Sequence, residues 1–146
     1  MKLSNPLFLA TAIALVACNP GTSNHEHNNQ GTDSTDNIQA LYDQVMDIHD
    51  EVMPKDGDIF LLKKKLQDEI AATPDMVIEK RKNLERRIAN LDSVRQLMMK
   101  WMHEFNPLPD TVDQETRRAY LELEMERIRK VKAAILEAIQ QENTNK

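Results

Sequence analysis

The sequence predicts an all-α protein, an antiparallel up-down-up bundle of three long, coiled-coil-like helices in residues 36–146. From Asp36 onward Leu, Ile, Met, Glu, Lys and Arg dominate, with few Gly or Pro residues. Apolar residues recur at intervals of three and four, the spacing that places them on one face of a helix. Two short proline-containing segments divide this pattern into three stretches of similar length, and short connections favour antiparallel neighbours.

The first helix is predicted to begin near Asp36 and to be kinked at Pro54. Its apolar residues follow the 3,4 spacing of a heptad seam, and the spacing resumes in the same phase after Pro54. They are Ile38, Leu41, Val45, Ile48, Val52, Ile59, Leu62 and Leu66. Pro54 lacks an amide N–H and clashes with the carbonyl of Asp50, so we expect a bend there, softened by Gly57. Two shorter helices are the alternative, because a residue that precedes proline avoids the helical conformation.

The second helix is predicted to start at Thr73-Pro74-Asp75, which offers a cap, a proline at the first helical position and an acidic first turn. It should run to Phe105, where Asn106 and Pro107 stop it. Its apolar face comprises Val77, Leu84, Ile88, Leu91, Val94, Met98, Trp101, Met102 and Phe105.

The third helix is predicted to start at a capping box formed by Thr111 and Gln114. We expect it to fray near Glu142. Its apolar face comprises Tyr120, Leu121, Ile128, Val131, Ile135, Ala138 and Ile139.

The N-terminus carries the pattern of a bacterial lipoprotein signal. Lys2 supplies the charge, and the apolar run from Leu7 to Val16 is about half the roughly 20 residues that span a bilayer. The tetrad Leu15-Val16-Ala17-Cys18 reads as a lipobox, which predicts a signal peptide over residues 1–17 and lipidation (palmitate) at Cys18. An ordinary secretory signal is the alternative, but a lone cysteine cannot form an internal disulfide. No cofactor is expected beyond this covalent lipid.

Residues 18–35 are predicted to form a disordered polar tether, because they contain no large apolar residue to bury. Resemblance to known lipoproteins, with Asn19 rather than aspartate after the cysteine, favours the outer membrane and its periplasmic face. The formal net charge of -5 disfavours nucleic acid as a partner. The lipid should therefore be the attachment to the membrane.

A second stripe on the first helix suggests a binding face. Tyr42, Met46, His49 and Met53 are spaced four, three and four residues apart, and a hairpin would bring them opposite a Met- and His-rich stretch of the second helix. Methionine and histidine suit Cu(I), which gives a candidate metal set. Adaptable Met side chains that fill gaps between helices are the simpler interpretation. The candidate metal ligands are His49, Met53, Met99 and His103, and the candidate interaction face is Tyr42, Met46, Met53 and Trp101.

The residues offer no catalytic constellation, and we do not expect an enzyme. The cysteine is assigned to the lipid, the sequence has no glycine-rich phosphate loop, and His49, Asp50 and Glu51 project in three directions from a helix.

Two segments carry a family resemblance. His49-Asp50-Glu51-Val52-Met53-Pro54-Lys55 and Trp101-Met102-His103-Glu104-Phe105, together with the lipobox, resemble small helical envelope lipoproteins of unknown function, often labelled viral A-type inclusion protein-like. Asp56 departs from the apolar Met that similar chains carry after Pro-Lys. The resemblance implies no activity.

Two classes of function remain open. The first is a lipid-anchored interaction or structural module that binds an envelope protein or another copy of the chain. The second is a periplasmic Cu(I)-binding or stress-sensing protein that uses the Met/His stripe.

Overall fold

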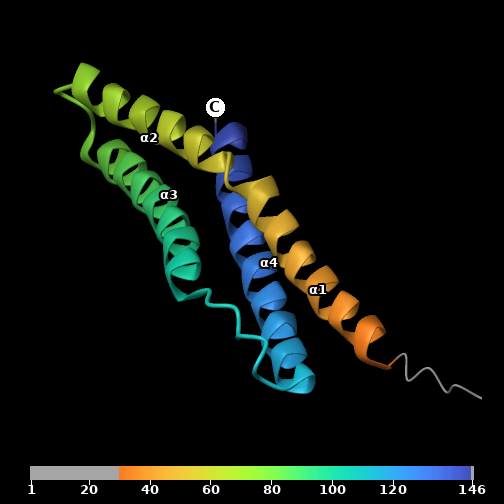
Figure 1. Ribbon diagram of the computed structural model, residues 1–146. Coiled ribbons are helices and arrows are strands. Elements are labelled where there is room, and N and C mark those ends of the chain that lie inside the picture. The colour runs from red at the N-terminus through yellow and green to blue at the C-terminus, as the bar shows by residue number, and fades with distance from the viewer. Residues whose placement is uncertain (1–29, 146) are drawn as a thin grey trace, which may run out of the picture.

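A computed structural model describes residues 30–145, which are helical apart from the connections between helices, with no strand in that range (Figure 1). The helices are α1 (Gln30–Val52), α2 (Lys55–Ala72), α3 (Ile78–Glu104) and α4 (Gln114–Thr144). The segments α1 and α2 form one long helix with a bend of 28°, so the chain makes three rods. The predicted three-helix bundle with a kinked first helix is confirmed.

Pro54 bends the first helix without ending its seam. The Met53 amide still donates to the His49 carbonyl at 2.8 Å, and the Asp56 and Gly57 amides then bond the carbonyls three residues back. These shorter-range bonds carry the backbone past the missing proline N–H. Buried apolar residues recur every seven positions on both sides of the bend. They are Ile38, Val45, Val52, Ile59 and Leu66.

The first helix begins earlier than predicted. α1 starts at Gln30, so residues 30–35, placed in the tether by composition, have helical backbone. Adding a residue to an existing helix costs far less free energy than nucleating a new helix. Polar residues can therefore extend a helix that is already formed. Residues 1–29, to which the sequence analysis assigns the predicted signal peptide, Cys18 and the rest of the predicted tether, lie outside the described part.

The predicted start of the second helix is wrong. α3 begins at Ile78, and Thr73 to Met76 form a turn closed by a bond from the Met76 amide to the Thr73 carbonyl. This turn buries Met76, a residue that the sequence pattern missed. Val77, predicted in the apolar face, is 71% exposed. Reversing the chain between two packed helices thus outweighs the local start signal of Thr73-Pro74.

Both ends of the third helix also differ from the prediction. Asp113 is the N-cap of α4 in place of Thr111, and its carboxylate accepts the Thr116 amide at 2.9 Å. That bond lowers the pKa of the Asp113 carboxyl. At the other end the helix continues to Thr144, because Glu142 is buried and bonded to α3 rather than frayed.

The helices pack around one continuous core. α1 lies mainly on α4, α2 on α3, and α3 on α4, as Figure 1 shows. An ion pair between Lys132 and Glu51 joins α4 to α1, which run in the same direction, and α3 runs antiparallel to both. On α4 the buried positions again recur every seven residues. They are Leu121, Ile128, Ile135 and, last, Glu142.

Candidate functional site

One column of side chains on the long first helix faces α3. Its members lie seven residues apart, so they occupy one side of the helix next to the buried seam. Each of them contacts α3, through ring stacking, a nitrogen–sulfur contact or an ion pair. The pairs are Tyr42 with Phe105, His49 with Met102, Asp56 with Arg95, and Lys63 with Asp92.

His49 sits in the middle of this column. Its Nδ1 lies 2.8 Å from Asp50 Oδ1, and its Nε2 lies 3.3 Å from Met102 Sδ. The ring is tilted against Trp101, with centroids 5.8 Å apart. The side chain is only 17% exposed. The structure thus brings a histidine of the predicted metal set against a methionine that the set did not include.

The other predicted metal ligands are more open. Met53 lies one turn after His49, and Met99 lies three residues before Met102, so both stand on the side of their helices where the two contact atoms meet. Both side chains are exposed. His103 is also exposed and forms none of the hydrogen bonds or ion pairs found among the described residues.

The predicted interaction face needs a correction. Trp101 is 3% exposed and belongs to the core, because its indole points toward α4 and not to solvent. Tyr42 and Met46 are half-buried. Of the predicted face only Met53 is exposed.

An aromatic cluster fills the space between α1, α3 and α4 at the end of α3. Phe105 is its centre, with ring centroids 4.8 Å from Trp101, 6.1 Å from Tyr42 and 6.3 Å from Tyr120. The Tyr120 hydroxyl accepts the Asn106 amide at 2.7 Å, and burial raises the pKa of this phenol. These large, stacked rings fill the space between helices whose backbones do not approach closely.

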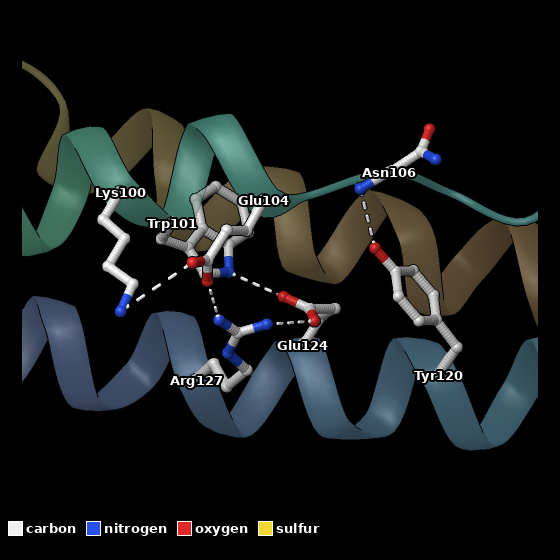
Figure 2. A network of polar contacts seen from close by, with 7 residues as sticks. All are labelled: Lys100, Trp101, Glu104, Asn106, Tyr120, Glu124 and Arg127. Carbon is white, nitrogen blue, oxygen red and sulfur yellow. Dashed lines mark hydrogen bonds and ion pairs between the residues drawn. The ribbon is translucent and has the colours of Figure 1, made fainter.

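A buried carboxylate on α4 anchors this end of α3. Glu124 is 2% exposed, and Figure 2 shows two donors converging on it. Trp101 Nε1 donates to Oε2 at 2.9 Å and Arg127 Nη1 donates to Oε1 at 2.8 Å. Arg127 also pairs with Glu104 on α3, and its bond to Glu124 raises the pKa of the guanidinium. Both carboxylate oxygens are therefore satisfied, as a buried charge requires.

A second buried carboxylate, near the end of α4, joins that helix to the first half of α3. Glu142 is 4% exposed and accepts two bonds from Arg87 Nε, at 3.1 and 3.0 Å, and one from Nη2 at 2.5 Å. These bonds raise the pKa of the Arg87 guanidinium. Sequence reasoning missed both acids. The signal was present for Glu142, which stands seven residues after Ile135 in the seam.

A groove of about 590 Å³ opens beside Glu142, where α4 stops and α2 and α3 continue (Figure 1). Leu62, Leu66 and Leu84 line it with apolar surface. Its charged rim includes Lys80, which pairs with Glu69 at 2.8 Å and lowers the pKa of that carboxyl. The remaining lining residues are Lys65, Asn83, Arg87, Glu142 and Asn145.

Comparison with known proteins gives no relative. No family model, curated protein or solved structure matches the chain. The resemblance to envelope lipoproteins therefore stays a prediction. Within residues 30–145 no helix has the length and apolar character needed to cross a membrane. In the same range no three His, Cys, Asp or Glu side chains gather as metal ligands would.

The hydrogen bonds to Glu124 predict that its variants lose stability in a defined order, with Glu124→Leu less stable than Glu124→Gln. Glu124→Leu leaves the buried Trp101 N–H without an acceptor, and we expect it to lower the free energy of unfolding by about 1–3 kcal/mol. Glu124→Gln keeps an oxygen for that N–H and should cost less. The matched control is Glu126→Leu, at an exposed position of the same helix. Urea unfolding followed by circular dichroism measures all three. Equal midpoints for Glu124→Leu and Glu126→Leu would contradict the assignment.

Proposed function

We propose that the protein is a lipid-anchored interaction module of the cell envelope, which docks a helix of a partner into the groove at the end of α4. The observation that carries this proposal is the lining of that groove, which combines Leu62, Leu66 and Leu84 with charged side chains. The turn that leads into α3 adds an exposed apolar side chain, because Val77, the N-cap of α3, is 71% exposed. Within the described residues α4 ends at Thr144, beside this groove.

The groove has the character of a helix-binding site. Apolar side chains on its floor and charged groups on its rim are what an amphipathic helix requires. Such a helix would continue the path of α4 and cover Leu62, which is half-buried. Among the described residues Lys65 forms no ion pair, and an acidic residue of the partner would complement it.

Three large apolar side chains of the same hairpin are exposed, Phe60 and Leu61 on α2 and Ile78 at the start of α3. A partner that docks in the groove would have these side chains on the same hairpin to contact.

The lipid is proposed from the N-terminal motif. Several acyl chains on Cys18 would hold the protein stably at a membrane, where a single chain binds only marginally. With the envelope address proposed for it, the protein would face the periplasm from the outer membrane, and the bundle would stand off the bilayer on its N-terminal segment.

The groove is tested by photo-crosslinking in cells. A photo-reactive amino acid replaces Asn83, an exposed residue that lines the groove, in the full-length chain, and the control replaces Leu123, an exposed residue of α4 far from the groove. We expect one discrete adduct from position 83, with a partner or a second copy, and none from position 123. The absence of an adduct at 83, or the same adducts from both positions, would contradict the proposal.

The anchor is tested by mass spectrometry of the native protein. We expect a mature chain that begins at Cys18 and carries acyl groups there. Metabolic labelling with an alkyne fatty acid should mark the wild type but not Cys18→Ala. A free thiol at Cys18 would refute the envelope address, and the crosslinking result would remain a separate question.

A further inference from the structure

The contacts of His49 cannot both be hydrogen bonds of a neutral imidazole. Asp50 Oδ1, 2.8 Å from Nδ1, is a carboxylate oxygen and only accepts, so Nδ1 carries the proton. In the neutral ring Nε2 is then a bare lone pair, and it points at the thioether sulfur of Met102 at 3.3 Å. Sulfur is itself an acceptor. A cation between the two atoms, either a second proton on Nε2 or a metal ion, would turn this contact of two acceptors into an attractive one.

The distance between the two atoms fits shared coordination of one metal ion. With the bond lengths of zinc sites as a guide, about 2.0 Å to an imidazole nitrogen and about 2.3 Å to a sulfur, a tetrahedral angle sets the two ligand atoms about 3.5 Å apart. The observed 3.3 Å is close to that separation and too short for a linear arrangement. A site of this geometry needs further ligands, and they must come from the open side.

Met53 and Met99 stand at that open side. Two contacts fix the register of the antiparallel pair, His49 with Met102 and Asp56 with Arg95. Met53 lies between His49 and Asp56, and Met99 lies between Arg95 and Met102, so the two exposed methionines lie at the same level. Their flexible thioethers can turn toward the contact pair without moving the backbone.

We propose that His49 and Met102, completed by Met53 and Met99, bind a soft monovalent cation, Cu(I) or Ag(I). One imidazole nitrogen and up to three thioethers form a soft ligand set, which selects such ions over Mg²⁺, Ca²⁺ or Zn²⁺. The carboxylate of Asp50 holds the Nδ1 proton and orients the ring, as outer ligands of metal sites do. The ion replaces any proton on Nε2, and no electron is transferred.

This site differs in one ligand from the set expected from the sequence, which was His49, Met53, Met99 and His103. Met102 takes the place of His103, because Met102 lies on the side of α3 that contacts the first helix and His103 lies on the exposed side. The site lies between α1 and α3, away from the groove beside α4, so it goes beyond the proposed docking function and can fail without it.

The test is a titration of the full-length chain with Ag(I), a redox-inert probe, in chloride-free buffer. The methyl resonances of the eight methionines, labelled with ¹³C, report binding residue by residue. The fluorescence of Trp101, the sole tryptophan, reports it independently, since its ring lies against His49 at a tilt. We expect the Met102 methyl to shift and Trp101 to be quenched together, with saturation by one equivalent at this site.

Three variants and a second metal decide the outcome. Met102→Leu and His49→Gln should raise the Ag(I) concentration needed for quenching at least tenfold, and His103→Ala should leave it unchanged. Circular dichroism checks that each variant keeps its helices. Zn(II) should not move the Met102 methyl. The proposal is overturned if that methyl stays in place while Ag(I) binds Cys18, His25 or His27, if Met102→Leu responds as the wild type does, or if Zn(II) produces the same shift.

Discussion

A proline inside a helix removes a backbone hydrogen bond and bends the helix. If the bend also rotated the helix, the apolar residues after the proline would turn away from the helices they pack against. In this chain the buried positions keep their seven-residue interval across Pro54, from Val52 to Ile59. The bend of 28° therefore redirects the seam without rotating it. α1 can then pack on α4 while α2 packs on α3, and the column that carries His49 faces α3 along its whole length. The position of the His49–Met102 pair depends on this preserved phase.

Two buried acids determine how the other rods meet. Glu124 and Glu142 on α4 are held by opposite halves of α3, through Trp101 and Arg87 respectively. Replacing a buried ion pair by apolar residues is often neutral for stability, whereas removing one partner is costly. We therefore expect these two acids to fix the register of α4 against α3 more than to add to the stability of the fold. Glu142 also stands near the end of α4, where the groove opens between the described parts of α2, α3 and α4. The length of α4 thus sets where the Glu142–Arg87 ion pair and the groove lie.

The periodic parts of this fold could be predicted from the sequence, and the parts decided by tertiary contacts could not. Heptad spacing gave three rods and the phase through Pro54, because burial on a helix follows its period. Thr73-Pro74 has every local mark of a helix start, but the chain must reverse there, and α3 begins at Ile78. The two buried glutamates were missed because the apolar pattern predicts burial only for apolar residues. An acid can also be buried when another helix supplies a hydrogen-bond donor, and a single helix's sequence does not show that donor. For the proposed metal site, spacing predicted His49, Met53 and Met99, and the contact of His49 with Met102 rather than His103 needed the register of two helices.

The preserved phase is tested most directly by shifting it. One alanine inserted between Pro54 and Lys55 rotates everything after it by about 100° on the helix. The account predicts a large fall in the urea midpoint, because Ile59 and Leu66 would leave the core while Val52 stayed in it. The control is one alanine between Asp110 and Thr111, two exposed residues of the loop before α4, which should change the midpoint little. Equal midpoints for the two insertions would contradict the claim that one continuous seam organises the molecule.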